Sequence, residues 1–388
     1  MNKKKQTKLK KVETMTSRER VMKAINHEPV DRVPIDLGMY YSTGISAFAY
    51  WHLREYLGLS TDEIEIIDMT QLLARVQEDI LRRFHCDCIL LHPGWPRTHL
   101  WNPRGKYNFW IPHTARPRLD GKGNWVLERN GTMLMPKDGY FFTGANLSFE
   151  DRYEDELIAH TAKEAEKIYK ETAYFTAFTG FRGFFKESDT EWMCRMVTNP
   201  DEIMEENRRV LEAELRKAAK VIKSMGRYIQ AVCLGEDLGT QHGPFIRPSV
   251  YEKLIAPFLK KLCSFIHENS DCKIFYHCCG SIKAMIPILL DCGIDILNPV
   301  QISAQDMEPA DLKREFGSKI TFWGGGCDTQ NVLNNGSVDE VSEHVRKLVR
   351  IFKTNSGYVF NPVHNIMGDV KPENIVAMFD AAYEESFY

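Results

Sequence analysis

Apolar positions along most of the chain follow two alternating patterns. Short apolar runs bounded by Gly, Pro, Asp or Asn are typical of buried strands, whereas longer stretches with an apolar residue every three or four positions are typical of helices that cover such strands. The runs predict strands at 33–38, 87–91, 174–180, 228–235, 273–276, 295–300, 320–323 and 358–360. The longer stretches predict helices at 17–27, 45–57, 61–84, 150–172, 181–196, 200–225, 249–268, 282–292, 309–316, 338–352 and 372–385.

The order of these elements predicts the fold class. Strands that alternate with helices indicate an α/β protein with a parallel sheet. Eight such units favour a closed (β/α)8 TIM barrel, whose catalytic face lies at the carboxyl ends of the strands. A doubly wound open sheet is the alternative, but Gly324, Gly325 and Gly326 follow a strand without the G-x-G-x-x-G spacing of a dinucleotide loop.

The region from about 95 to 146 breaks the helical periodicity. Its short aromatic runs are separated by Arg104-Gly105, Asp120-Gly121, Asn130-Gly131 and Asp138-Gly139, which are hairpin turn signals. We therefore expect one barrel domain over residues 16–388, with an antiparallel β-meander inserted after the second strand. The meander either covers the site or serves only as a structural flap. Residues 1–15, with six lysines and no apolar periodicity, predict a basic disordered arm.

Composition narrows the classes of function. A net charge of −3 gives no overall basic field, so we expect no nucleic-acid partner. No apolar signal segment follows the N-terminal lysines, and no run of about 18 apolar residues is present, so we expect no membrane span. These features predict a cytoplasmic protein whose ten cysteines stay reduced.

A candidate metal site lies at the end of the strand predicted at 273–276. His277 and Cys279 are two residues apart, so a strand-like backbone directs both side chains to one side. An imidazole and a thiol suit Zn²⁺, which in catalytic sites takes three protein ligands. We expect His364 to be the third ligand, with Cys327 and Glu236 as alternatives at other strand ends. Because H-x-C alone is a weak motif, a satisfied His beside a buried Cys pair is the competing interpretation.

Several motifs together resemble one family. They are Arg18-Glu19-Arg20-Val21, Asp31-Arg32-Val33-Pro34, Gly235-Glu236-Asp237-Leu238-Gly239, His277-Cys278-Cys279-Gly280 and Pro372-Glu373-Asn374-Ile375. In this order they resemble the uroporphyrinogen decarboxylase superfamily, over roughly residues 16–383. The resemblance implies a (β/α)8 barrel, in agreement with the strand count.

The resemblance is closer to one of two branches of that superfamily. True decarboxylases carry an arginine-rich stretch after the first strand and an Asp after the second, whereas residues 37–42 contain no Arg and residues 91–94 no Asp. The other branch comprises zinc methyltransferases that work with corrinoid proteins and carry H-x-C followed downstream by Cys. His277 and Cys279 match that motif, and His364 stands near the position of the downstream Cys.

The resemblance therefore implies a zinc-dependent methyltransferase. It would move a methyl group between a small substrate or thiol and a cobalamin (corrinoid) held by a partner protein, with Asp237 or Glu236 handling protons. The alternatives are a decarboxylase of the porphyrin pathway or of a smaller substrate, and a barrel that only binds a ligand. A homodimer is left open.

Aromatic residues near two strand ends suggest a substrate entrance. We expect Tyr40, after the first strand, and Trp95, at the start of the insertion, to line it, and Gln301 to contact substrate from strand six. An aromatic rim with few charges suits a small, weakly polar ligand. The alternative is that these aromatic side chains only pin the insertion to the barrel.

Overall fold

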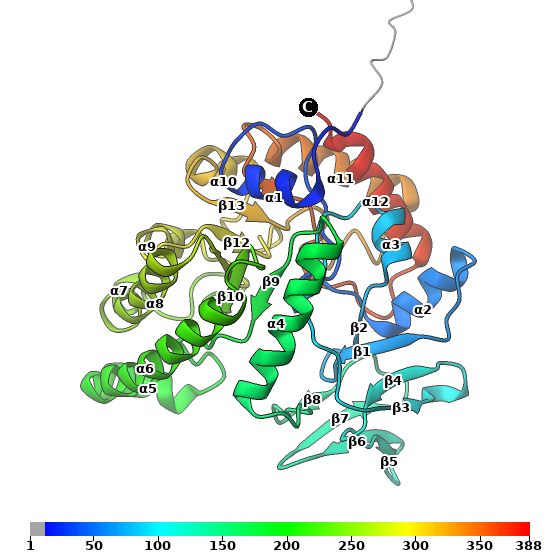
Figure 1. Ribbon diagram of the computed structural model, residues 1–388, viewed down its shortest axis with the longest axis horizontal. Helices are drawn as coiled ribbons and strands as arrows, with labels where there is room; N and C mark the ends of the chain where they lie inside the picture. The colour runs from blue at the N-terminus through cyan, green and yellow to red at the C-terminus, as the bar shows by residue number, and fades with distance from the viewer. Residues whose placement is uncertain (1–11) are drawn as a thin grey trace, which may run out of the picture.

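The centre of the molecule is a six-stranded parallel sheet. The structure, a computed structural model, describes residues 12–388. The strand order is β14-β13-β12-β11-β10-β9, and every neighbouring pair is parallel. The strands are β9 (Ala177–Thr179), β10 (Ala231–Gly235), β11 (Lys273–His277), β12 (Ile296–Asn298), β13 (Thr321–Trp323) and β14 (Tyr358–Val359). The predicted α/β class with a parallel sheet is thus confirmed (Figure 1).

Two predicted strands are reduced to isolated parallel bridges at the edges of this sheet. Ile35 pairs with Phe360 just after β14, and Cys88 pairs with Phe175 just before β9. The two segments also meet each other, because the backbone N–H of Asp87 donates to the carbonyl of Ile35 at 2.7 Å. Backbone pairing therefore continues beyond both edge strands, although these segments are too short to count as strands.

Helices surround the sheet in Figure 1, and several begin and end where the sequence predicts. In α11 (Val338–Phe352), Ser337 and Glu340 form a capping box, and Val341, Val345 and Phe352 are buried on one face. The helix predicted at 249–268 is divided at Ile255. Further helices are α1 (Ser17–Ile25), α2 (Ala47–Tyr56), α4 (Glu154–Glu171), α6 (Pro200–Met225), α7 (Pro248–Leu254), α8 (Ala256–Asn269), α9 (Ile286–Asp291), α10 (Pro309–Phe316) and α12 (Pro372–Ser386).

Two helix predictions need correction. Of the helix expected at 181–196, only α5 (Thr190–Thr198) forms, because the backbone N–H groups of Phe184 and Phe185 instead bind the buried carboxylate of Glu236. The helix expected at 61–84 is replaced by β1 (Ile64–Asp68), β2 (Leu73–Ala74) and the short α3 (Glu78–Arg83). Three isoleucines in β1 favour a strand, and β1 buries Ile64 and Ile66.

The insertion contributes strands to two small sheets at the lower right of Figure 1, one of which also contains β1 and β2. The first, β5-β6-β7-β8, is antiparallel throughout, as expected of the meander. The second has the order β2-β1-β4-β3 and includes the parallel β1–β4 pair, which the sequence did not predict. The strands are β3 (Thr98–Trp101), β4 (Phe109–Pro112), β5 (Arg118–Leu119), β6 (Asn124–Glu128), β7 (Thr132–Pro136) and β8 (Thr143–Gly144).

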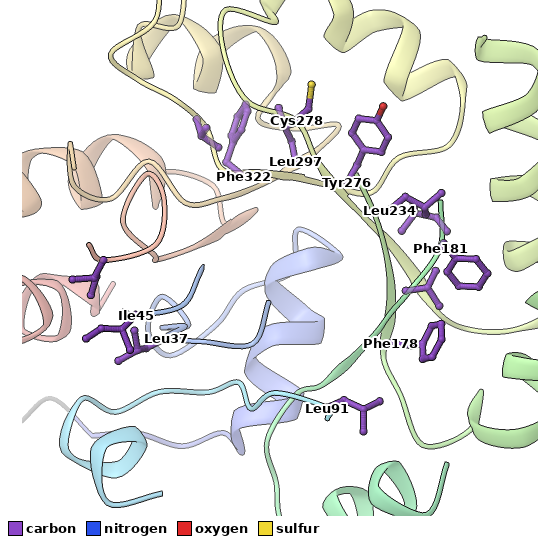
Figure 2. Close-up of a cluster of buried hydrophobic side chains, with 14 of the residues drawn as sticks. Leu37, Ile45, Leu91, Phe178, Phe181, Leu234, Tyr276, Cys278, Leu297 and Phe322 are labelled. Atoms are coloured by element: carbon purple, nitrogen blue, oxygen red, sulfur yellow. The ribbon is translucent and has the colours of Figure 1, made fainter. Parts of the chain in front are cut away.

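Apolar side chains pack on both faces of the parallel sheet. One cluster includes Phe275, Trp323 and Val359 from the strands, and it packs against Val21 and Ile25 of α1. The larger cluster fills the space between the other face and the surrounding helices. Figure 2 shows part of it, with Phe178, Leu234, Tyr276, Leu297 and Phe322 coming from successive strands.

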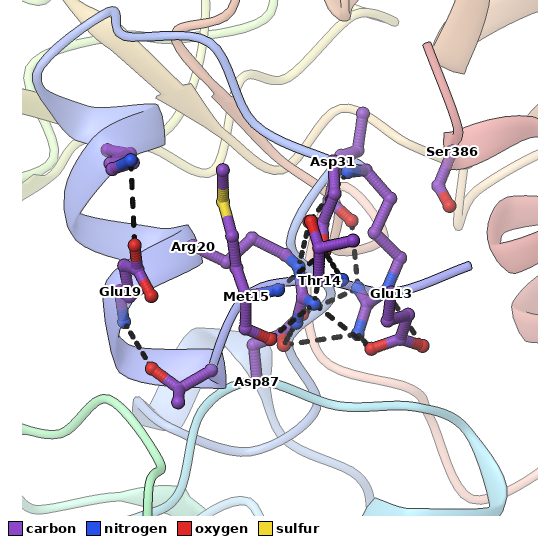
Figure 3. A network of polar contacts seen from close by, with 12 residues as sticks. Glu13, Thr14, Met15, Glu19, Arg20, Asp31, Asp87 and Ser386 are labelled. Atoms are coloured by element: carbon purple, nitrogen blue, oxygen red, sulfur yellow. Dashed lines mark hydrogen bonds and ion pairs between the residues drawn. The ribbon is translucent and has the colours of Figure 1, made fainter. Parts of the chain in front are cut away.

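A buried ionic network joins α1 to the start of the sheet (Figure 3). Asp87 binds Arg20 at 2.6 Å and Arg32 at 2.7 Å, and all three side chains are almost fully buried. Arg20 also binds Asp31 at 2.6 Å and Glu13 at 3.1 Å. Of the predicted basic arm, residues 1–11 lie outside the described residues, whereas Glu13 takes part in this network.

Candidate metal centre

Three metal-ligating side chains converge at the carboxyl ends of β11 and β14. His277 is the last residue of β11, Cys279 follows it, and His364 lies beyond β14. One ligand atom from each lies within 4.8 Å of the others, and residues 12–388 contain no second group of three such side chains. Ligands on one tetrahedral zinc are about 3.6 Å apart, so small side-chain movements would close the set.

The side chain of Asn298 fixes the orientation of His277. Asn298, at the end of β12, is fully buried, and its Oδ1 atom lies 2.9 Å from Nδ1 of His277. The Nδ2 atom of Asn298 donates to the carbonyl of Trp323, and Ser42 donates to Oδ1 at 2.6 Å. Because Oδ1 can only accept, His277 must carry its proton on Nδ1, which leaves the Nε2 lone pair 3.4 Å from Cys279 Sγ.

His364 is also prepared to act as a ligand. Its Nδ1 atom faces Oδ1 of Asn365, whose Nδ2 atom donates to Gln71. Burial, reinforced by the neighbouring His277, lowers the pKa of His364, so this imidazole stays neutral at pH 7. A neutral imidazole with Nε2 unprotonated is the form that binds a metal.

Among residues 12–388, no lysine or arginine acts on the Cys279 thiol to stabilise a thiolate. Burial, together with the Asp237 carboxylate, raises the pKa of Cys279, so the thiol is protonated at neutral pH. Asp237 accepts the backbone N–H of Cys279 at 3.0 Å and lies 3.6 Å from Nε2 of His277. A bound cation would reverse this preference and hold the sulfur as a thiolate, so the donor set fits a zinc ion.

The structure does not bring Glu236 or Cys327 to this cluster. The Glu236 carboxylate is buried and accepts bonds from Tyr276 at 2.6 Å, Tyr251 at 2.8 Å and the backbone of Phe184 and Phe185. The Cys327 thiol is buried elsewhere and faces the carbonyl of Asp328. Glu236 therefore holds the 184–185 backbone and is not placed to exchange protons with a ligand.

The predicted substrate residues have different surroundings. The Tyr40 ring packs on Phe275 and on His277, with a centroid distance of 5.8 Å to the imidazole. Gln301 accepts the backbone N–H of Gly280 at 2.9 Å and so shapes the turn after Cys279. Gly280 has φ near 91°, and a side chain there would collide with the backbone of Gly239. Trp95 instead lines a separate cavity and donates to the carbonyl of Ile66 at 2.7 Å.

Sequence reasoning missed Asn298 and Asp36, two buried polar residues within predicted strands. Asp36 accepts a hydrogen bond from Trp323 Nε1 at 2.9 Å, and burial raises the pKa of Asp36 to about 6. The available signal was a polar residue inside an apolar run, as in Ile296-Leu297-Asn298 and Ile35-Asp36-Leu37. Such residues are buried only when they have partners.

Comparisons with known proteins agree with this architecture. The model of the uroporphyrinogen decarboxylase (URO-D) family matches residues 182–385, which is more than half of the 388 residues. No curated protein matches the chain.

Among solved structures, a methyltransferase from Methanosarcina mazei has the same fold. It is 14% identical, with a TM-score of 0.58, and the alignment covers 96% of this chain and 99% of that one. A β-glucosidase from Pyrococcus furiosus matches with 10% identity, coverage of 93% and 96%, and a TM-score of 0.42. None of the helices in residues 12–388 has the length and apolarity needed to cross a bilayer.

Proposed function

Because the chain belongs to the uroporphyrinogen decarboxylase family, we propose that it is a member with a zinc-dependent methyltransferase activity. It would move a methyl group between a small substrate or thiol and a corrinoid held by a partner protein. The observation that carries this proposal is the His277, Cys279 and His364 cluster at the carboxyl ends of the parallel strands. The M. mazei structure with the same fold is described as a methyltransferase, and we extend that activity to this chain.

We also propose that the parallel strands close into a (β/α)8 barrel. Support comes from the bridges of Ile35 to Phe360 and of Cys88 to Phe175, and from the bond between Asp87 and Ile35 that joins the two edges. Val21 and Ile25 of α1 pack against the enclosed face. Closure would explain how residues at the carboxyl ends of β11 and β14, three strands apart in the sheet order, share one site.

The residues of the cluster have distinct proposed roles. His277, Cys279 and His364 would hold the ion, and Asn298 keeps His277 in the tautomer that ligation needs. Bound zinc supplies a Lewis acid that keeps a thiol ionised at neutral pH. Asp237, whose side chain is 41% exposed, would accept the proton of an incoming thiol and pass it to solvent. Tyr40 would limit the space beside His277.

Decarboxylation is the second candidate, because the family match also includes decarboxylases. A polycarboxylate substrate needs cationic partners, and residues 37–42 at the end of the first parallel segment provide none. We therefore rank decarboxylation lower.

Zinc content is the first test. Protein purified without chelator should contain about one zinc per chain, and H277A, C279S and H364A should each lose most of it. H364C should keep zinc, because thiolate also ligates it. C327A is the matched control, since that thiol is buried away from the cluster. Little zinc in the wild type, unchanged in H277A, would exclude the metal site.

The reaction itself is tested with methylcobalamin and simple thiols. The proposal expects loss of the methylcobalamin spectrum with wild type and little change with C279S. If carbon dioxide is released from a porphyrinogen and the cobalamin spectrum stays constant, decarboxylation is the correct function.

A further inference from the structure

A cavity of about 700 Å³ lies at the ends of β1 and β9, bounded by residues 91–95, by residues 147–152, and by α4 and α6. Its walls include Tyr41, Asp68, Trp95, Phe178 and Arg182, and none of the three proposed metal ligands lines it. Its volume is in the range of small-molecule sites. Tyr41 connects it to the cluster, since its ring lies 5.8 Å from that of Tyr40, which packs on His277.

Most of the charged side chains that line the cavity are paired. Glu150 binds Arg152 at 2.6 Å, and Lys217 binds Glu214 at 3.0 Å. Two charged groups are left: neither Asp68 nor Arg182 has an ion-pair partner within residues 12–388. The cavity thus presents one unpaired carboxyl group and one unpaired guanidinium.

Asp68 is a half-buried residue at the end of β1. One of its oxygens accepts the backbone N–H of Gln71 at 2.6 Å. Burial raises the pKa of Asp68, and no lysine or arginine of residues 12–388 offsets this effect. Arg182, in contrast, is exposed, and its backbone N–H rather than its guanidinium contacts Glu214. A carboxylate ligand can therefore reach the guanidinium without breaking an existing ion pair.

Aromatic side chains form the apolar part of the wall. Trp95 is held by its bond to Ile66 and by edge contact with His92. Burial, with a smaller effect of the Asp68 carboxylate, raises the pKa of Tyr41 to about 12, so its ring stays neutral. Phe178 and Leu91 lie along neighbouring strand segments in Figure 2. Aromatic faces close to a carboxylate are a typical site for a methylated ammonium group.

We propose that this cavity binds a small zwitterion of the betaine type, with its carboxylate on Arg182 and its methylated ammonium between Asp68 and the rings of Tyr41 and Trp95. A ligand with one cationic and one anionic group would form an ion pair with each of the two unpaired side chains, Asp68 and Arg182. The inference concerns binding alone and does not depend on a bound metal.

Isothermal titration of the full chain with three probes of similar size tests this inference. The probes are glycine betaine, 3,3-dimethylbutyrate, which lacks the cation, and choline, which lacks the carboxylate. Wild type should bind glycine betaine about tenfold or more tightly than either of the others. D68N should remove the preference over dimethylbutyrate, and R182M should remove the preference over choline.

Neither D68N nor R182M should disrupt the fold. The amide oxygen that D68N introduces can still accept the N–H of Gln71, and Arg182 is exposed. R209M, on the exposed face of α6 outside the cavity, is the control and should bind as wild type. No binding of any probe, equal binding of all three, or preferences unchanged in D68N and R182M would overturn the inference. Titrations repeated after chelator treatment should be unchanged, which separates this result from the zinc test.

Discussion

Nδ1 of His277 and Oδ1 of Asn298 lie 2.9 Å apart at the ends of neighbouring strands β11 and β12. Asn298 cannot rotate away, because its Nδ2 atom donates to Trp323 and its Oδ1 atom also accepts from Ser42. The contact therefore sets which nitrogen of His277 faces Cys279. Asn298 is thus a positioning residue, which acts through His277 and contacts no reacting atom.

Replacing Asn298 should weaken zinc binding without removing any ligand. We expect N298L to lower zinc affinity about 10–100-fold, because His277 would lose the acceptor that selects its tautomer. N298D keeps an acceptor oxygen and should retain more affinity than N298L. Competition with a chromophoric chelator measures the affinity, and nitrogen NMR of the imidazoles reports the tautomer.

Asn374 provides a matched control for the loss of a buried asparagine. It is also buried, and it donates to the carbonyls of Leu333 and Gly336. N374L should therefore destabilise the fold but leave zinc affinity and the His277 signals as in wild type. Equal zinc affinity in N298L and wild type would contradict the positioning role.

Substitutions at the neighbours Glu236 and Asp237 should affect different properties: the first should lower stability, and the second should lower the rate of methyl transfer. E236L removes the acceptor for four donors in the interior, so we expect the free energy of unfolding to fall by about 3 kcal/mol or more. D237N, on the exposed side of the cluster, should change stability by less than about 0.5 kcal/mol. Its rate of methyl transfer should fall about a hundredfold, because the proton acceptor is lost.

Urea denaturation and a methylcobalamin assay on the same preparations separate the two effects. The assay is normalised to folded protein, so that unfolding of E236L is not counted as loss of chemistry. A D237N variant with normal rates would remove Asp237 from the mechanism. A stable E236L variant would show that the buried carboxylate is dispensable.

The buried Asp36 should make stability depend on pH. Burial raises its pKa from 3.8 to about 6. Between these pH values the unfolded chain loses this proton while the folded chain keeps it, so the contribution of Asp36 to stability falls as pH rises from about 4 to about 6. Wild type should lose about 3 kcal/mol relative to D36N over this interval and then level off.

Urea denaturation at half-unit pH steps checks this prediction. D271N is the control, because it makes the same change of charge at an exposed position and should follow wild type. A constant difference between wild type and D36N from pH 4 to 7 would contradict the shifted pKa.

Burial should determine how much each ion pair contributes to the free energy of unfolding. The Arg20–Asp87 and Arg82–Glu78 pairs both measure 2.6 Å, but the first is buried and the second is exposed. D87A leaves two buried guanidinium groups without their carboxylate and should lower the free energy of unfolding by about 3–5 kcal/mol. E78A should leave it almost unchanged, because water solvates both partners of that pair. Thermal and urea unfolding of both variants measure the losses of stability. Equal losses in D87A and E78A would contradict the larger contribution of the buried pair.

The sequence predicted elements best where local signals agree. The apolar periodicity of 338–352 predicted a helix with correct ends, and the structure adds a Ser337–Glu340 capping box at its start. At 61–84 the signals conflicted: acidic residues resembled a helix start, whereas Ile64, Ile66 and Ile67 favour a strand. The parallel partner of that strand, β4, is more than forty residues away, so no local pattern reveals it.

The candidate site shows the same division between local and long-range information. A period of two along one strand places His277 and Cys279 on the same side, and this is visible in the sequence. The choice of a third ligand among His364, Cys327 and Glu236 depends on distances between strands, which no spacing in the sequence gives. The pairing of Asn298 with His277 is likewise a property of neighbouring strand ends.

The first parallel segment is held by residues from the far end of the chain. The backbone N–H of Val33 donates to the carbonyl of Ser386 at 3.0 Å, and Arg32 forms an isolated antiparallel β-bridge with Phe387. The carboxylate of Glu13 accepts a hydrogen bond from the hydroxyl of Tyr383. During synthesis on the ribosome, the early residues cannot form these bonds until residues 383–387 have been made. Contacts of such long sequence separation slow folding and prolong the exposure of unpaired strand edges. We therefore expect completion of the fold only after residues 383–387 have emerged from the ribosome, and a dependence on chaperones that grows with temperature.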